Sequence, residues 1–422
     1  MTFVPFWSKK GLTKVEFQDN QTIFALCVIF FVPAINNFVN SILQLGLSVY
    51  FPFVTPISYI FMALVSGLFL FKLMLKKKLF LGIFAFGVFG CMLSYVLYPE
   101  IRSIIYGSPV DLVYSPVNKL IFFCIPALVG TACVSDYQKM LSKMRVWSLV
   151  TAIFGVVTYL FVVLIKGEVL QYMVYSYFML LPVCVCFEYS NMQKTKLDFI
   201  VAVVGSISMV ICGARGALLS LLMYFLISVF HYDFRRLSSK QVLQLFVVFS
   251  FIVIIFLFYD ELLDIISRVF EYLNIDSRSI DFLQDDAFFD DSGRTSIART
   301  ILDGILANPI GYGLYGDRYV SGTFGTSTYH YAHNIFLELF CDFGIVGGIA
   351  AITILAYLIV NVIASFKNKN EIHLVFAIIP YAIFQLQFSS TYLENIPFFA
   401  LLGIAISCIM KKSRKRDTEE SL

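Results

Sequence analysis

The sequence has few charged residues. They make up 14% of its 422 residues, against 59% hydrophobic residues, and the mean hydropathy is +0.82. A soluble protein of this length could not cover so apolar a chain with so little charge, so lipid must solvate much of it. The sequence also lacks the segments of about ten alternating apolar and polar residues that are typical of a transmembrane β-barrel. Apolar runs of about 20 residues recur instead, and they predict an all-α polytopic membrane protein.

These apolar runs predict about 12 transmembrane helices in a single membrane domain, residues 1–422. The predicted spans are 20–38, 53–72, 79–98, 118–134, 146–165, 169–188, 197–213, 215–231, 241–259, 334–364, 371–388 and 392–410. The first run is short, and Pro33, Asn36 and Asn37 interrupt it. No cleavable signal peptide is expected, because this run follows a polar stretch and lacks a small-residue cleavage site.

Lysine is nearly absent from every second connection between the predicted spans. With the N-terminus in the cytoplasm, 22 of the 31 Lys and Arg fall in the cytoplasmic connections and termini. The positive-inside rule is then obeyed at each turn of the chain, and both termini are cytoplasmic. The basic run KKSRKR follows the last span directly, so it is predicted to lie near anionic lipid, and no nucleic-acid partner is expected.

Neither cysteine nor histidine occurs in a recognisable metal-binding pattern. All nine Cys lie in or beside apolar runs, and the only close pair is Cys184 and Cys186, so packing residues are predicted. His330 and His333 form an H-x-x-H pair, but no nearby carboxylate completes a ligand set. We therefore predict no metal and no cofactor. A surface His without a role and a general base both remain open, since imidazole titrates near neutral pH.

Residues 260–332, between the ninth and tenth spans, are predicted to form a large external loop with short amphipathic helices. Its start, DELLDIISRVFEYLNI, has apolar residues at helical spacing. The segment RTSIARTILDGILANP predicts a second short helix that stops at Asn308 and Pro309. A Gly- and Tyr-rich loop then leads into span ten. Its G-x-G-x-x-G at Gly311 lacks the strand and helix of a dinucleotide site, so we expect these glycines to let the backbone pass close to another group.

The basic residues of this loop are all arginine. No Lys occurs between Lys240 and Lys367, whereas the loop has 12 acidic residues beside its five Arg. The guanidinium fork can pair with two phosphate oxygens, or it can form ion pairs with the neighbouring Asp side chains. The five residues are Arg268, Arg278, Arg294, Arg299 and Arg318, and both interpretations stay open for all of them except Arg294, which lies in a motif described below.

Two polar features are predicted within the apolar part of the chain. Residues 197–231 lie between two basic flanks, so they must form a hairpin of two short spans that turns near Arg215. An Arg at membrane depth costs at least about 2.5–3.5 kcal/mol and needs an anionic partner, unless it extends to the outer headgroups. In span ten, Asn334, Glu338 and Asp342 form a polar stripe. This stripe faces either a cavity or a hydrogen-bonded neighbouring helix.

Three segments occur in a fixed order around the external loop. They are GARGALLS at 213–220, GRTSIARTILDGILANPIGYG at 293–313 and HNIFLELFCDFGIVGG at 333–348. Each motif alone is loose, but the ordered set with this topology resembles the O-antigen polymerase and O-antigen ligase superfamily, and the resemblance covers the whole chain.

This resemblance implies a metal-independent membrane glycosyltransferase with a GT-C-like fold. It would lie in the bacterial cytoplasmic membrane, with its active site on the periplasmic or external side and a polyprenyl-pyrophosphate-linked oligosaccharide as donor. On the matching positions, Arg215 and Arg294 would hold the pyrophosphate, and His333 would activate the acceptor hydroxyl. The further residues predicted to bind substrate are Arg299, Arg318, Tyr312, His330, Asn334 and Glu338.

The acceptor distinguishes two activities within this superfamily. The stretch ELFCDFGIVGG resembles polymerases of the Wzy type, which would add a second lipid-linked repeat unit and could work with a chain-length regulator protein. A ligase would transfer the glycan to lipid A-core. A glycolipid flippase is the alternative from another class, but it should carry several charges within its spans and an internal repeat. This sequence has few such charges and no detected repeat.

Overall fold

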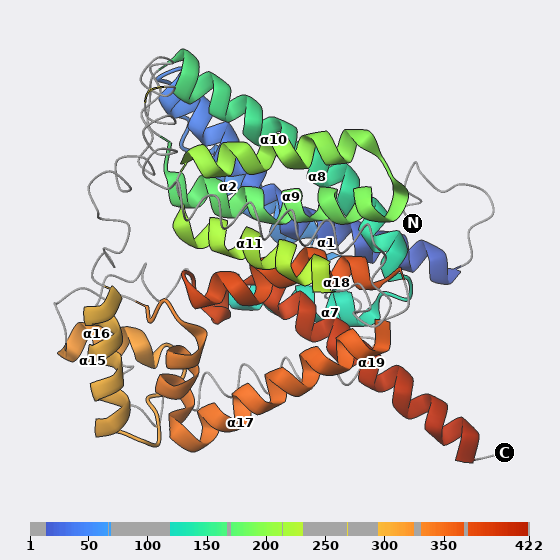
Figure 1. The fold of residues 1–422 in the computed structure, drawn as a ribbon, viewed down its shortest axis with the longest axis vertical. Helices are drawn as coiled ribbons and strands as arrows, with labels where there is room; N and C mark the ends of the chain where they lie inside the picture. Colours follow the sequence, from blue (N-terminus) through green and yellow to red (C-terminus); the bar gives the residue numbers. More distant parts are fainter. Residues whose placement is uncertain are drawn as a thin grey trace. The chain divides into compact units, whose positions relative to one another are not determined.

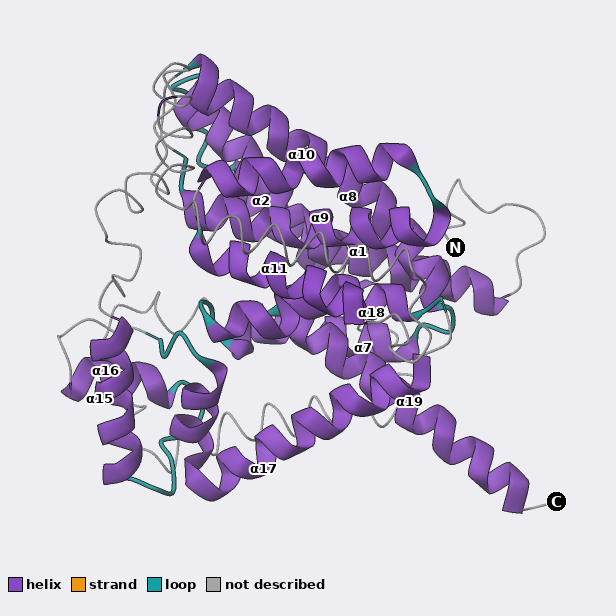
Figure 2. Cartoon of the chain, in the orientation of Figure 1, coloured by secondary structure: helices purple, strands orange, loops and turns teal. Residues whose placement is uncertain are grey.

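The computed structural model of the protein describes residues 14–65, 67–68, 119–166, 170–212, 214–230, 268, 294–324, 331–366 and 370–420. Within these ranges every regular element is a helix (Figures 1 and 2), and twelve of them are α-helices. The predicted all-α fold is therefore confirmed for this part of the chain. The predicted spans 79–98 and 241–259 lie outside the described residues, as does nearly all of the amphipathic helix predicted at the start of the external loop.

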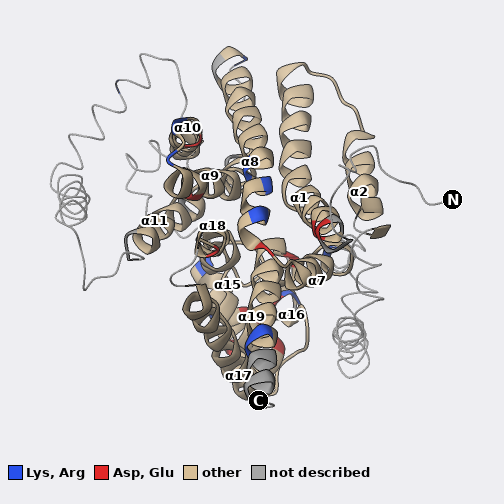
Figure 3. Ribbon diagram, turned by 90° about the vertical axis from the view of Figure 1, so that its right-hand side faces the viewer, with Lys and Arg blue, Asp and Glu red and all other residues tan. Residues whose placement is uncertain are grey.

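Four of the described helices are long and apolar enough to cross a bilayer. They cover residues 18–46, 137–163, 173–193 and 335–366, and shorter apolar helices cover 54–65, 120–133, 216–228 and 372–387. Along the described part of the ribbon, Lys, Arg, Asp and Glu residues occupy few positions (Figure 3). The chain is thus a membrane protein with candidate transmembrane helices, and the total of 12 spans remains a prediction.

The chain divides into two compact units, and the first contains residues 1–33, 56–147 and 293–422. Its helices are the start of α1 (Lys14–Ser41), most of α2 (Val54–Val65), α7 (Ile125–Cys133) after the π-turn Leu120–Cys124, the start of α8 (Tyr137–Tyr159), α15 (Arg294–Ala307), α16 (Gly316–Phe324), α17 (Ile335–Phe366), α18 (Ile372–Ile379) and α19 (Ile396–Glu420). Gly403 allows α7 and α19 to pack closely, because a Cβ at this position would collide with the Thr131 hydroxyl. That hydroxyl lies 2.9 Å from the Ala400 carbonyl oxygen, to which it donates.

The second unit contains residues 34–55 and 148–292. Its helices are the end of α1 with the π-turn Ile42–Gly46, the rest of α8 with the π-turn Leu160–Ile165, α9 (Tyr172–Gln193), α10 (Lys196–Cys212) and α11 (Arg215–Phe230). The predicted hairpin is confirmed as α10 and α11. The Tyr175 hydroxyl links three helices, because it lies 3.2 Å from the Gly155 carbonyl oxygen of α8 and 2.9 Å from the Ser208 Oγ of α10.

The last two predicted spans differ from the observed helices at the connection between them. After α18 the chain continues as the π-turn Pro380–Phe384 and the 3-10 turn Gln385–Gln387. The next helix, α19, begins at Ile396, four residues later than predicted, because the Asn395 side chain caps it by accepting from the Phe398 N–H (2.8 Å). A polar connection, residues 389–395 with the sequence SSTYLEN, therefore separates the two helices and contains the 3-10 turn Tyr392–Glu394.

Within the predicted external loop, one expectation is confirmed and one is wrong. The second short helix is α15, which ends at Ala307 as the Asn308-Pro309 signal predicted. The Gly- and Tyr-rich stretch was expected to be irregular, but it contains α16. Tertiary contacts explain this helix, since the Gly316 N–H at its start donates to the Asp342 carboxylate (3.0 Å), a residue 26 positions further along the chain.

Candidate functional site

Helix α17 is broken at Gly344, so the single long span expected at 334–364 consists of two helical parts. Gly344 has φ 70° and ψ −179°, a backbone conformation that is open almost only to glycine. The first part, 335–343, carries both acids of the predicted polar stripe, and the second part, 345–366, has no acidic or basic residue. The physical reason for the difference is this glycine, which interrupts the helical hydrogen bonds without interrupting the apolar pattern.

The turn Pro309–Gly313 fills the break. A broken helix leaves carbonyl oxygens without donors from the next turn. Here the N–H groups of Tyr312 and Gly313 donate to the carbonyl oxygens of Cys341 and Asp342, at 2.8 and 2.9 Å. The Ile345 N–H donates in turn to the Pro309 carbonyl oxygen (2.9 Å). The glycines of this turn do pass close to another group, as expected from the sequence, and the group is the α17 backbone.

Helices α15 and α17 pack on each other, and this turn joins the C-terminal end of α15 to the break in α17 (Figure 1). Apolar side chains of α15 (Ile297, Ile301 and Ile305) form one cluster with Leu337 and Cys341 of the first part of α17 and with Ala332, which precedes that helix. The two helices therefore run in the same direction toward the break. Their first residues, Arg294 and Ile335, lie toward the opposite end, and His333 comes two residues before Ile335.

His333 is held in a turn just before α17. Its backbone has φ 53°, in the left-handed region, and its half-buried ring lies with its centroid 4.0 Å from that of Tyr331. The next residue, Asn334, caps α17: its side-chain oxygen accepts from the Phe336 and Leu337 N–H groups at 2.9 and 3.2 Å. The side chain of Asn334 thus caps the N-terminus of α17.

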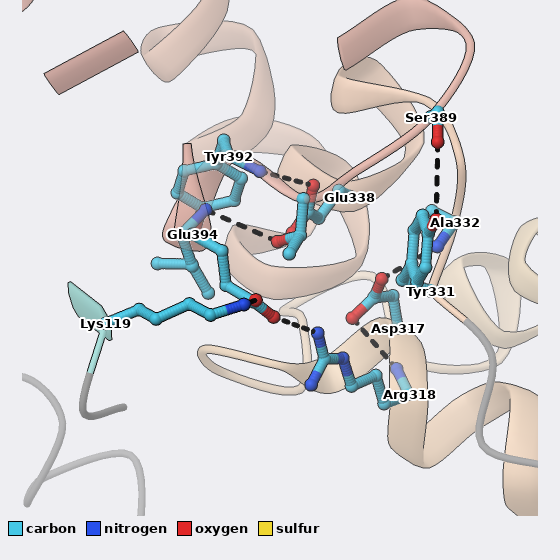
Figure 4. A network of polar contacts seen from close by, with 11 residues as sticks. Lys119, Asp317, Arg318, Tyr331, Ala332, Glu338, Ser389, Tyr392 and Glu394 are labelled. Atoms are coloured by element: carbon cyan, nitrogen blue, oxygen red, sulfur yellow. Dashed lines mark hydrogen bonds and ion pairs between the residues drawn. The ribbon is translucent and has the colours of Figure 1, made fainter. Parts of the chain in front are cut away.

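The acids of α17 bind the polar connection 389–395 (Figure 4). The buried Glu338 carboxylate accepts from the Thr391 hydroxyl and from the Tyr392 N–H (3.2 Å). The Tyr392 hydroxyl donates to the other buried acid, Asp342, at 2.8 Å. Of the two interpretations of the polar stripe, these contacts favour structural hydrogen bonds between neighbouring segments.

Two cations bracket the carboxylate of Glu394 (Figure 4). Lys119 Nζ and the Arg318 guanidinium each lie 2.8 Å from one of its oxygens. Burial alone would raise the pKa of Glu394, but Lys119 and Arg318 outweigh it and hold this pKa below its usual value. Burial would likewise lower the pKa of Arg318, and Asp317 and Glu394 reverse that effect and raise it. These three side chains join α16 to the starts of α7 and α19.

Asp317 is a further buried carboxylate beside this ion pair. Its two oxygens accept from the backbone N–H groups of Arg318 and Ala332, both at 2.8 Å. Burial raises the pKa of Asp317, against the lowering by Arg318 and by these backbone donors. The carboxylate therefore connects the start of α16 to the residue that precedes His333.

The remaining predicted site residues have different surroundings. Tyr312 is buried in the α15–α17 cluster, and its hydroxyl donates to the Gly304 carbonyl oxygen (3.0 Å). Arg294 is half-exposed at the start of α15, and Arg299 is exposed on the same helix. Arg215 begins α11 in the second unit, but its side chain lies outside the described residues, as does all of His330. Among the described residues, no group of three His, Cys, Asp or Glu side chains could hold a metal ion.

Several residues of this region were not predicted from the sequence. Lys119, Asp317 and Tyr331 were not singled out, nor were Ser389, Thr391, Tyr392 and Glu394 of the connection 389–395. The available signal was the connection itself, because seven mostly polar residues between two apolar runs are more than a tight turn needs. Their partners on α16 and α17 could not be read from spacing, since the contacts join segments 50 or more residues apart.

Comparison with known proteins gives a family match for part of the chain. A model of the Wzy_C family, described as O-antigen ligase, matches residues 200–352. No curated protein and no solved structure matches the chain. The matched stretch contains all three motif segments, 213–220, 293–313 and 333–348, and ends after the Gly344 break. The resemblance found in the sequence is confirmed for this stretch.

Proposed function

We propose that the protein is a polysaccharide polymerase, on the premise that residues 200–352 match a family that covers O-antigen ligases and polymerases. The protein would join lipid-linked oligosaccharide repeats into a longer glycan at the outer face of the cytoplasmic membrane. The donor would be a polyprenyl-pyrophosphate-linked oligosaccharide, and the acceptor a hydroxyl of a second lipid-linked repeat.

The reaction would be a single displacement at the anomeric carbon. The acceptor oxygen forms a bond to that carbon while the bond to the diphosphate oxygen breaks, and the electron pair leaves with the diphosphate. Two guanidinium groups, those of Arg215 and Arg294, would stabilise the negative charge that develops there. His333 would take the proton of the acceptor hydroxyl.

The observation that carries this proposal is the family match across all three motif segments. The arrangement of the first unit supports it, because α15 and the first part of α17 place Arg294 and His333 toward the same end of a packed helix pair. Arg318 is not assigned to the substrate, because a substrate phosphate would have to displace Glu394 from the Arg318 guanidinium. We therefore assign the diphosphate to Arg294 and Arg215.

Purified protein incubated with a polyprenyl-pyrophosphate-linked oligosaccharide tests the proposal. We expect longer glycans and released polyprenyl pyrophosphate, both reduced to a small residual rate in His333→Ala, Arg215→Ala and Arg294→Ala and both retained in the matched controls His373→Ala and Arg145→Ala. Activity should survive a metal chelator. Full chain-length ladders in His333→Ala and Arg215→Ala would contradict the proposal, and movement of intact donor across vesicle membranes without bond cleavage would indicate a flippase.

A ligase is the second candidate, because the matching family is described as O-antigen ligase. Its acceptor would be lipid A-core. Offering the labelled donor with lipid A-core and with unlabelled lipid-linked repeats in parallel separates the two activities. Label transferred only to lipid A-core would replace the polymerase assignment while leaving the roles of the three residues unchanged.

A further inference from the structure

The backbone of His333 is strained. A left-handed conformation, here φ 53°, is unfavourable at a residue with a Cβ, and such residues persist where the surrounding structure fixes them. They cluster at functional sites, because a fixed backbone also fixes the side chain.

Two backbone contacts hold the turn, one on each side of His333. On the C-terminal side, Asn334 caps α17 through its side-chain oxygen. On the N-terminal side, the Ala332 N–H donates to the Asp317 carboxylate at 2.8 Å. Asn334 acts within its own helix, whereas Asp317 lies on α16 and ties the turn to a separate element.

The Asp317 carboxylate is itself well anchored. Its side chain is buried, and its second oxygen accepts from the Arg318 N–H (2.8 Å). The start of α16 is fixed further by the bond from the Gly316 N–H to Asp342, and the Arg318 guanidinium is fixed by Glu394. The Asp317 carboxylate is therefore held in place as an acceptor for the Ala332 N–H.

We infer that Asp317 is a positioning residue for His333, setting the backbone conformation from which the imidazole takes the proton of the acceptor hydroxyl. This inference rests on the proposed function. Asp317 acts through the Ala332 N–H and has no role in holding the donor, so its loss should slow turnover and leave donor binding unchanged.

Asp317→Asn is the informative substitution. The amide keeps the size of the carboxylate, but only one of its two polar atoms accepts a hydrogen bond, so one of the two N–H donors is left facing an NH2 group. We expect kcat for polymerisation to fall about 10- to 100-fold. We expect KM for the lipid-linked donor to stay within about threefold, because the two Arg are unchanged. The matched control is Asp303→Asn, at an exposed position of α15, which should behave like the wild type.

A double-mutant cycle distinguishes positioning from a general structural effect. In a His333→Ala background, Asp317→Asn should lower the residual turnover no further, because the residue through which it acts is already gone. A second loss of the same size would overturn the inference. If His333→Ala is strongly impaired while Asp317→Asn equals the wild type, only the positioning role fails. If His333→Ala is fully active, the proposed function fails with it.

A second measurement needs no activity. Diethyl pyrocarbonate modifies accessible imidazoles, and mass spectrometry gives the modification rates of His333 and His373 in the same sample. We expect Asp317→Asn to raise the ratio of the His333 rate to the His373 rate about threefold or more. The ratio cancels general loosening of the fold, and an unchanged ratio would contradict the inference.

Discussion

Gly311 and Gly344 lie backbone against backbone. A Cβ on Gly311 would collide with the Gly344 nitrogen, and a Cβ on Gly344 would collide with the Ile310 carbonyl group. Both residues have positive φ, 97° and 70°. The turn after α15 and the break in α17 are thus two halves of one contact, and neither can form without a glycine on its own side.

Gly344→Ala should destabilise the protein by at least about 1–3 kcal/mol, because it adds a collision to a strained backbone conformation. The measurement is the thermal unfolding midpoint of purified protein in detergent. Gly67→Ala is the matched control, since a Cβ there meets nothing within 4 Å. Equal midpoints for the two variants would show that the break tolerates a side chain.

Tyr392→Phe should cost about 1–3 kcal/mol, because it leaves the buried Asp342 carboxylate without the hydroxyl that donates to it at 2.8 Å. The same substitution at Tyr357, an exposed residue of α17, provides the control and should change stability by less than about 0.5 kcal/mol. Unfolding midpoints of the two variants test this, and a stable Tyr392→Phe would mean that the connection 389–395 is held by other contacts.

Glu394→Gln should destabilise the protein in a pH-dependent way. The folded-state pKa of Glu394 is lowered, so its stabilising contribution is complete above its ordinary value of 4.5 and is lost as the pH falls through the folded pKa. The difference in unfolding midpoint between wild type and variant should therefore be constant at neutral pH and shrink below about pH 4.5.

Glu371→Gln, at the start of α18, is the control for this experiment. A Glu394→Gln difference in unfolding midpoint that grows as the pH falls would contradict the assignment of the ion pair.

Lys119→Ala should lower the free energy of unfolding by only about 1 kcal/mol or less, since the Lys119 side chain is 35% exposed.

Arg294→Ala and Arg318→Ala should separate catalysis from stability. Arg294 is half-exposed, so its loss should change stability by about 0.5 kcal/mol or less and reduce turnover by about 10²- to 10³-fold. Arg318 is buried against Glu394, so its loss should leave a buried carboxylate short of a partner and lower the unfolding midpoint. Paired measurements of midpoint and turnover test this, and the reverse pattern would exchange the roles of the two residues.

Local sequence signals predicted those helices well whose bounds depend on neighbouring residues alone. The hairpin near Arg215 followed from an apolar run between two basic flanks, and the end of α15 followed from Asn308-Pro309. The break in α17 was not predicted, because Gly344 lies in an apolar run that also suits an unbroken span. Helix α16 and the roles of Glu338 and Asp342 depend on contacts with distant segments, and no local pattern encodes those.

The break also has a consequence for depth in the lipid. The second part of α17, residues 345–366, contains 22 residues and would be about 33 Å long, close to the thickness of a hydrocarbon core of about 30 Å. The nine residues of the first part add about 13 Å. If Gly344 sits at the outer boundary of the hydrocarbon, those nine residues set the height of the His333 imidazole above that boundary. The imidazole would then lie in the headgroup zone, where a diphosphate on a membrane-tethered prenyl chain would be found.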